Sequence, residues 1–354
     1  MIHRFTANNF RCLENVELSL SPDFNLIYGP NASGKTSILE ALAYLGRGKS
    51  FRGAPTTSLV RHGEQAFVLF GETSAGGRHQ RVGVRNSREG LEIRVDGQGD
   101  GGAAALAEAL PLQVIDPEVH DLVAGGPEQR RRFIDWIAFH VEPDHLLAWR
   151  RFRRALKQRN AALKGRASAA AIRSWDAEFV ELGMRLDASR RAALDIARDA
   201  LVDHGERLLG TALGFEYQQG WSSSKELAQA LEEGLDRDQQ QGATQSGPHR
   251  ADLKVTYDER QARKLVSRGQ QKLLACAMIL AATEVVQRHL KQPLLLLLDD
   301  PAAELDKDSV TLLMECVEGL GSQVIATTLD PGEALFSEPP RLFHVEHGQV
   351  REAT

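Results

Sequence analysis

The chain has 354 residues with a net charge of −5, and 42% of its residues are apolar and 26% charged. These values are typical of a globular protein with one large domain or two coupled ones. They exclude a polycation, so a nucleic-acid surface could only be a local patch. Three widely spaced cysteines without a C-x-x-C pair argue against a disulfide framework or a zinc site. The start lacks the apolar core of a signal peptide and the longest apolar run is too short to span a bilayer, so we expect a cytoplasmic protein with no membrane partner.

The first third of the chain has the pattern of short strands separated by turn signals. A helix is expected at residues 36–46, with Gly46 as its C-terminal stop. The strands are expected at residues 15–20, 23–29, 66–72, 81–84, 91–97 and 110–118.

The middle of the chain becomes helical from Pro127 to about Leu209. Apolar and aromatic residues recur in steps of three and four at 145–163 and again at 175–186. We expect an antiparallel helical pair with a short tip, followed by a mobile loop at 236–247.

The last third returns to an α/β pattern. The uniformly apolar run at 293–299 is typical of a strand buried on both faces. The two α/β parts, residues 1–126 and 245–354, should therefore form one head interrupted by a helical lobe at 127–244. Strands are expected at 251–257, 293–299 and 322–328, an edge hairpin or strand at 341–350, and helices at 269–290 and 308–320.

A phosphate-binding loop is predicted by "GPNASGKT", which matches G-x-x-x-x-G-K-[ST] between an apolar strand and a helix. Glycines let successive N–H groups point at phosphate oxygens, and the helix N-terminus adds partial positive charge. Lys35 would neutralise the β/γ oxygens and Thr36 would offer its hydroxyl to Mg²⁺. We therefore predict ATP and Mg²⁺ as cofactors. The expected phosphate-binding residues are Gly29, Pro30, Asn31, Ala32, Ser33, Gly34, Lys35, Thr36 and Ser37.

The apolar strand at 293–299 ends in two acids. A P-loop protein places a carboxylate beside Mg²⁺ at such a strand end. Asp299 is the expected metal-side residue, and Asp300 stands where related ATPases keep the general base. The alternative is a turn in which both aspartates are solvated.

The segment "KLVSRGQQKLL" precedes that strand. A serine–glycine helix start is weak evidence alone, because serine and glycine commonly cap helices. Its position resembles the signature segment of ABC-type ATPases, which implies an ABC-ATPase-like P-loop head. In that class Ser267 and Gly269 would contact the γ-phosphate held by the other protomer, with Asp306 at the dimer seam. Two copies would then share two composite sites.

The order of all these segments, together with "NNFRCLENVELSL", "GGPEQRRRFIDW", "LKQRNAALK" and "SGPHRADL", resembles the RecF family of bacterial DNA repair proteins over nearly the whole chain. The resemblance implies an ATP-dependent homodimer that binds gapped DNA, helps to load RecA with RecO and RecR, and serves fork maintenance and the SOS response. It also places Gln113 in a loop that senses the γ-phosphate and the metal. Lys35, Asp299, Asp300 and Ser267 would form the catalytic set.

Two departures from the ABC pattern favour slow hydrolysis. The histidine that usually follows the strand at 322–328 is missing, and Asp300 replaces the more usual glutamate. We therefore expect weak turnover that DNA raises. The alternatives are a transporter ATPase subunit, which would normally keep the histidine, and a tether similar to the structural-maintenance-of-chromosomes (SMC) proteins with a degenerate ATP site.

Two basic clusters are candidates for sequence-independent DNA contact, because duplex DNA rewards several phosphate contacts together. The alternative is a solvated helix face paired with acids such as Asp176. Arg11 and Arg52 are further candidates to reach the nucleotide or a partner chain. The first cluster comprises Arg150, Arg151, Arg153, Arg154, Lys157, Arg159, Lys164 and Arg166, and the second Arg130, Arg131 and Arg132.

Overall fold

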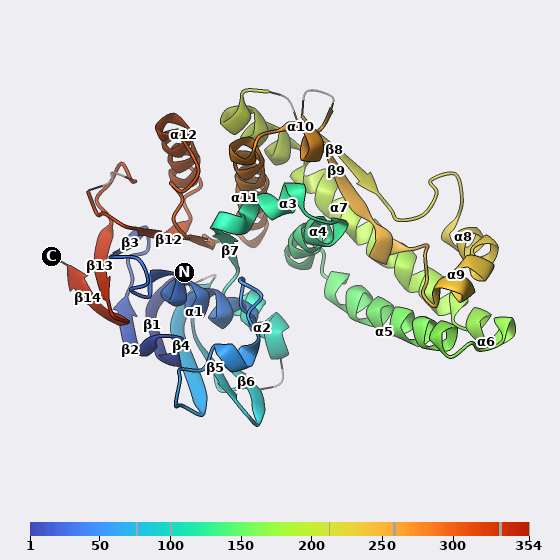
Figure 1. Cartoon of the computed structure of the whole chain (residues 1–354), viewed down its shortest axis with the longest axis horizontal. Coiled ribbons are helices and arrows are strands. Elements are labelled where there is room, and N and C mark those ends of the chain that lie inside the picture. Colours follow the sequence, from blue (N-terminus) through green and yellow to red (C-terminus); the bar gives the residue numbers. More distant parts are fainter. Residues whose placement is uncertain (76, 100, 212, 258–259, 333–334, 354) are drawn as a thin grey trace. The chain divides into compact units, whose positions relative to one another are not determined.

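The computed structural model describes residues 1–75, 77–99, 101–211, 213–257, 260–332 and 335–353. Contacts divide the chain into two compact units (Figure 1). The first unit comprises Met1–Val119 and Leu290–Thr354, and the second comprises His120–His289. An α/β unit made of both ends of the chain is thus interrupted by an insert, as the change of sequence pattern indicates.

The first unit contains two sheets. The antiparallel sheet has the order β2-β1-β4-β5-β6, and the mixed sheet has the order β14-β13-β3-β12-β11-β7. In the mixed sheet only β14 is antiparallel to its neighbour. The antiparallel strands are β1 (Ile2–Phe10), β2 (Leu13–Ser19), β4 (Ala66–Ala75), β5 (Arg78–Ser87) and β6 (Gly90–Val95). The mixed sheet contains β3 (Phe24–Tyr28), β7 (Leu112–Ile115), β11 (Leu295–Leu298), β12 (Gln323–Thr328), β13 (Arg341–Glu346) and β14 (Gln349–Ala353).

Helix α1 (Lys35–Arg47) joins the two sheets through one hydrophobic core. The core contains Leu42 of α1, Phe5 and Phe67 of the antiparallel sheet, and Ile325 of the mixed sheet. Burial of this apolar surface, at about 25 cal/mol per Å², holds the start of α1 against the carboxyl ends of the parallel strands. The other helical elements of this unit are η1 (Thr56–Ser58), α2 (Gly102–Ala109) and α12 (Lys307–Glu318), and η2 (Pro117–His120) lies at its boundary with the insert.

Helix α1 ends two residues later than the sequence predicts. Gly48 adopts the left-handed conformation that ends it, with a φ of 65°. Gly46 lies inside the helix instead, where a Cβ would come within 2.5 Å of Leu112 Cδ2. Gly46 is therefore required for close packing rather than as a helix stop.

The second unit is mainly helical. Its long pair is antiparallel, because His145 of α5 bonds Ser189 of α7 at 2.8 Å while Phe152 contacts Phe179 farther along. The predicted helical pair is confirmed, although α7 is longer than its apolar pattern suggests. The helices are α3 (Asp121–Ala124), α4 (Pro127–Val141), α5 (His145–Lys164), α6 (Ala169–Arg173), α7 (Asp176–Leu209), α8 (Leu227–Glu233), α9 (Leu235–Gln241), η3 (Pro248–Arg250), α10 (Ala262–Leu265) and α11 (Arg268–Leu290), the last residue of which belongs to the first unit.

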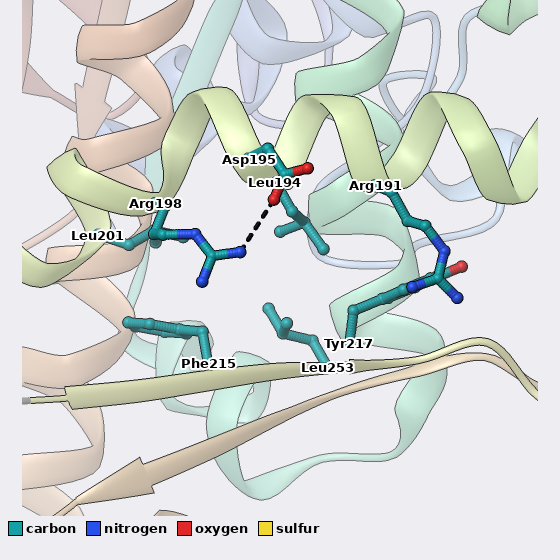
Figure 2. A pocket seen from close by; sticks show the side chains of 8 residues that line it. All are labelled: Arg191, Leu194, Asp195, Arg198, Leu201, Phe215, Tyr217 and Leu253. Atoms are coloured by element: carbon teal, nitrogen blue, oxygen red, sulfur yellow. Dashed lines mark hydrogen bonds and ion pairs between the residues drawn. The ribbon is translucent and has the colours of Figure 1, made fainter. Parts of the chain in front are cut away.

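This unit also contains a three-stranded antiparallel sheet, which a purely helical lobe would lack. Its order is β10-β9-β8, with β8 (Leu213–Gln218), β9 (Asp252–Tyr257) and β10 (Arg260–Gln261). Figure 2 shows a small cavity of about 190 Å³ between this sheet and α7. In this view the Phe215 and Tyr217 rings extend in opposite directions above the sheet, Arg198 reaches from the helix toward Phe215, and Arg191 reaches toward Tyr217.

The mobile loop predicted at 236–247 is wrong over its first half, where α9 forms. Asp238 in this helix is buried and accepts a hydrogen bond from Arg159 at 2.6 Å. The polar composition misled the prediction because the charge that neutralises Asp238 lies on another helix, distant in the sequence.

Contacts group residues 245–289, including most of α11, with the insert rather than with the C-terminal part of the head. Within the described residues, one helix, α11, is long and apolar enough to cross a membrane. Its most apolar 18-residue window is 72% buried inside the protein, which is the usual situation of a core helix.

Candidate nucleotide site

The loop after β3 has the backbone that its glycines predict. Gly29 has a φ of 152° and Gly34 a φ of 117°, values that other residues rarely adopt. A Cβ on Gly29 would lie 2.2 Å from the carbonyl oxygen of Val345, so a side chain there is excluded. The two glycines therefore shape the turn that leads into α1.

The loop offers polar groups that protein atoms leave free. Pro30, Asn31 and Ala32 are exposed on its rim, whereas Ser33 is 4% exposed. The Ser33 Oγ is buried and makes no hydrogen bond within the described part of the chain. The first turn of α1 contains no acidic residue of its own. A buried hydroxyl and a free helix N-terminus fit an anion such as a phosphate group.

Lys35 lies across the loop. Its Nζ donates to the carbonyl oxygens of Gly29 at 2.6 Å and Pro30 at 3.0 Å. Burial lowers the pKa of Lys35, while the charges of Asp300 and Asp299 raise it. These two aspartates therefore lie within electrostatic reach of the ammonium group.

A hydrogen-bonded set connects α1, β11 and β12. The Thr36 hydroxyl donates to Asp299 Oδ1 at 3.0 Å, and the Thr327 hydroxyl donates to the same oxygen at 2.9 Å. Asp299 is 6% exposed, and burial raises the pKa of its carboxyl despite both hydrogen bonds. A buried carboxylate next to a threonine hydroxyl fits a hard divalent cation such as Mg²⁺.

The turn after β11 places Asp300 with the main chain in an unusual conformation. Its φ is 50°, which is uncommon for a residue other than glycine. The Asp300 N–H donates to the Thr327 hydroxyl at 2.9 Å, so one threonine holds both aspartates. From the sequence, Thr327 stands out only as a residue in the region of a missing histidine. All residues of β12 are buried, so the sequence pattern of this strand does not predict that Thr327 contacts the two aspartates.

Gln113 does not join this set. It pairs with Leu296 in the register of β7 and β11, whereas Asp299 extends the alternate face of β11. Its side-chain oxygen accepts a hydrogen bond from Arg47, near the C-terminal end of α1, at 3.1 Å. The prediction that Gln113 faces the metal therefore finds no support in this arrangement.

The signature segment begins α11 with a capping box. The Ser267 Oγ accepts a hydrogen bond from the Gln270 N–H at 3.3 Å, and Gln270 Oε1 accepts one from the Ser267 N–H at 3.0 Å. Ser267 is exposed, and Gly269 follows in the first turn. Asp306 caps α12 by accepting a hydrogen bond from the Ser309 N–H at 2.9 Å. Both residues have a local structural role in one chain, and a role across a dimer stays a prediction.

Most of the first basic cluster is free, but one member is not. Arg159 is fully buried and forms ion pairs with Asp176 at 2.8 Å and Asp238 at 2.6 Å. Its assignment to a DNA-facing cluster was wrong, because the sequence shows a cation without showing its burial. The other seven, which are exposed and form no ion pair within the described residues, are Arg150, Arg151, Arg153, Arg154, Lys157, Lys164 and Arg166.

The second basic cluster is mainly structural. Arg130 is 5% exposed, and its guanidinium forms two hydrogen bonds to Asp252 at 2.7 and 3.1 Å. Arg131 donates to the carbonyl oxygen of Ala251, and exposed Arg132 pairs with Glu128 in its own helix. This cluster therefore supports the fold of the insert.

The two isolated arginines differ in placement. Arg11 donates two hydrogen bonds to the buried carboxylate of Glu40, at 2.9 and 2.8 Å. Burial is the largest influence on the pKa of Asp299 and raises it, whereas the threonine hydrogen bonds lower it. The charge of exposed Arg52 also lowers this pKa, by a smaller amount. Arg52 thus lies near the site, and Arg11 is engaged within the fold.

Comparison with known proteins places this geometry in a class. The model of the RecF/RecN/SMC N terminal domain matches residues 1–350. A solved structure of the recombination mediator protein RecF with ATP, from the RecFOR pathway, is similar with a TM-score of 0.90 at 24% identity, covering 100% of this chain and 97% of that one. An SMC head bound to the C-terminal winged-helix domain of ScpA has a TM-score of 0.62 at 15% identity, covering 99% and 96%. These likenesses confirm the predicted fold, an α/β head of the ABC-ATPase type with a P-loop and an inserted helical lobe.

Sequence relatives define the family within that class. The DNA replication and repair protein RecF of Edwardsiella ictaluri (strain 93-146) is 40% identical over 352 residues, which is 98% of each chain. RecF of Pseudomonas aeruginosa (strain LESB58) is 39% identical over 361 residues, 99% of this chain and 97% of the relative. The chain belongs to the RecF family of DNA replication and repair proteins.

Proposed function

We propose that this protein is an ATP-dependent switch that pairs with a second copy of itself and binds DNA at single-strand gaps beside duplex. The observation that carries the proposal is the convergence of Lys35, Thr36 and Asp299 at the free N-terminus of α1. When bound, Mg²⁺ would neutralise phosphate charge at Thr36 and Asp299, and the loop would hold the triphosphate. Mg²⁺ is usually held by one or two carboxylates together with substrate phosphates, and Asp299 would supply one such carboxylate.

The residues of this site favour a switch over a fast enzyme. Asp300 is one methylene shorter than a glutamate, and its unusual backbone conformation is held by Thr327 rather than by a histidine. A base placed farther from the attacking water gives slow turnover, since proton transfer requires hydrogen-bond reach. We infer that ATP binding closes two copies, that hydrolysis releases them, and that DNA raises the rate.

Pairing would place the signature of one copy against the nucleotide of the other. Ser267 and the N-terminus of α11 form an exposed, capped helix start, which is a suitable anion-binding group. Each dimer would then contain two such composite sites. RecR, RecO and, functionally, RecA are the proposed partners because related proteins belong to the RecFOR pathway.

The exposed basic face of α5 is the proposed DNA surface. Arg150, Arg153 and Lys157 lie on one helix, and no carboxylate within the described residues neutralises them. The Arg153 guanidinium lies 4.6 Å from the centre of the Trp149 ring, a contact that leaves its charge available. Phosphate binding by such residues releases counterions and makes affinity fall with salt.

Charge reversal tests this surface. In the variant R150E/R153E/K157E, DNA affinity should fall, and the slope of log affinity against log salt should weaken by about 0.9 for each phosphate that the protein no longer neutralises. A matched control is R78E/R94E/R351E, which changes the net charge by the same amount at three exposed arginines of the first unit that form no ion pair within the described part of the chain. Equal slopes for the α5 variant and the wild type would remove α5 from the proposal.

The alternatives predict different responses of hydrolysis. A transporter subunit would be stimulated by a membrane protein and not by DNA. A structural tether with a degenerate site would show no turnover at all, although Lys35, Thr36 and Asp299 are all present and converge. Measurement of ATP hydrolysis with and without gapped DNA separates these alternatives.

A further inference from the structure

The carboxyl end of β7 carries a carboxylate that the predicted site did not include. β7 and β11 are parallel neighbours, with Val114 paired to Leu297. The pairing continues beyond the strands, because the Asp299 N–H donates to the carbonyl oxygen of Ile115 at 2.8 Å. Adjacent strands lie about 4.8 Å apart and alternate residues share a face, so Asp116 follows β7 at the level of Asp299 and on the same face.

The electrostatics of Asp116 indicate an unmatched negative charge. Burial raises the pKa of its carboxyl to about 6, and the neighbouring charge of Asp299 adds to the rise. The Arg47 guanidinium opposes this weakly, since it donates its hydrogen bonds to Leu112 and Gln113 instead. Within the described residues no cation forms an ion pair with Asp116. A buried carboxylate and a partly buried one that repel one another are both stabilised when a divalent cation lies nearby.

We propose that Asp116 is a positioning residue of the Mg²⁺–ATP site and increases its affinity for the divalent cation. The inference rests on the proposed function, because it needs the loop at Gly29–Thr36 to bind ATP with Mg²⁺. Mg²⁺ keeps several of its waters in proteins and binds near one or two carboxylates. Asp116 and Asp299 supply two carboxylates at one edge of the sheet, and Asp116 accepts hydrogen bonds from the cation's waters. Asp116 takes the place at the end of β7 that was expected for Gln113.

A purely structural role for Asp116 is the competing explanation. Its carboxylate accepts a hydrogen bond from the Glu118 N–H, which stabilises the short turn η2. Asparagine at position 116 has nearly the same shape and can still accept that hydrogen bond. Asp116→Asn therefore removes the charge and keeps the turn.

The experiment follows binding of a fluorescent ATP analogue to the full-length protein as Mg²⁺ is added. Asp116→Asn should leave the affinity without Mg²⁺ within about twofold of wild type. The Mg²⁺ concentration at the midpoint should rise about tenfold or more, as for losses of outer-sphere groups in other metal sites. Glu118→Gln removes an exposed carboxylate two residues away and is the matched control, with an unchanged midpoint.

The outcomes separate this inference from the proposed function. If Asp299→Asn shifts the midpoint strongly and Asp116→Asn shifts it less than about twofold, the role of Asp116 is overturned and the Mg²⁺–ATP site stands. If Mg²⁺ does not tighten nucleotide binding in the wild type, both fail. If Asp116→Asn does not fold, Asp116→Ser is measured in the same assay and judged by the same two results.

Discussion

Charged side chains in the nucleotide site have few neutralising partners in the protein, whereas those buried in the helical insert are paired with opposite charges. At the nucleotide site Lys35 and Asp299 are gathered at one edge of a sheet, with few protein partners to neutralise them. In the insert Arg159 and Arg130 are enclosed by carboxylates, with ion pairs of 2.6 to 2.8 Å. The first arrangement leaves charge available for a ligand, and the second uses it to hold helices together. A basic side chain is therefore a candidate for ligand binding only when no carboxylate of its own protein neutralises it.

The largest expected effect comes from the enclosed arginine. Arg159→Met should lower the free energy of unfolding by about 3–5 kcal/mol, because Asp238 is left buried without its partner. Arg154→Met, an exposed site on the same helix, should change it by less than about 0.5 kcal/mol. Urea unfolding followed by circular dichroism measures both. Similar urea midpoints for the two variants would show that buried Arg159 contributes no more to stability than exposed Arg154.

The second largest effect is expected at the nucleotide site, on replacement of Lys35. Lys35→Ala should reduce ATP hydrolysis by about 100-fold or more, since it removes a charge aimed at the transferred phosphoryl group. The fold should remain intact because Lys35 bonds only loop carbonyls in the described structure. Lys291→Ala, an exposed lysine of the same unit, is the control. The measurement is the steady-state rate of phosphate release. Comparable rates for the two variants would contradict a role of Lys35 in ATP hydrolysis.

A smaller effect tests how the two aspartates are held. Thr327→Val keeps the side-chain shape and removes the hydroxyl that bonds Asp299 and the Asp300 N–H. Loss of these two bonds should slow hydrolysis roughly tenfold or more, since one such bond in a buried site is worth about 1–1.5 kcal/mol. Thr327→Ser should restore most of the rate because it keeps the hydroxyl. A valine variant as fast as the wild type would show that Thr327 is not needed.

The sequence predicts local features well because their physical causes are local. The loop at Gly29–Thr36 needs its glycines for backbone conformation, and an apolar strand ending in Asp299 needs only its own residues to be recognised. Most strands of the two sheets and the antiparallel helical pair follow from periodicity in the same way, but β1 (Ile2–Phe10), which lies between β2 and β4, was not predicted.

What the sequence does not reveal depends on pairing between distant segments. Asp116 and Thr327 join the site only because β7 and β12 flank β11, a strand order that no local pattern determines. The same applies to Gln113, whose face of β7 is set by register, and to Asp238, which is buried by Arg159. A strand order and a register are needed before such residues can be assigned.

The central claim is that ATP joins two copies through the exposed start of α11. The direct test is the molar mass by light scattering with and without ATP and Mg²⁺, for wild type and Ser267→Arg. We predict that ATP doubles the mass of the wild type, whereas the variant binds a fluorescent ATP analogue with normal affinity and stays at its mass without nucleotide. A wild type whose mass does not change with bound ATP, or a Ser267→Arg variant that still doubles, would contradict the account.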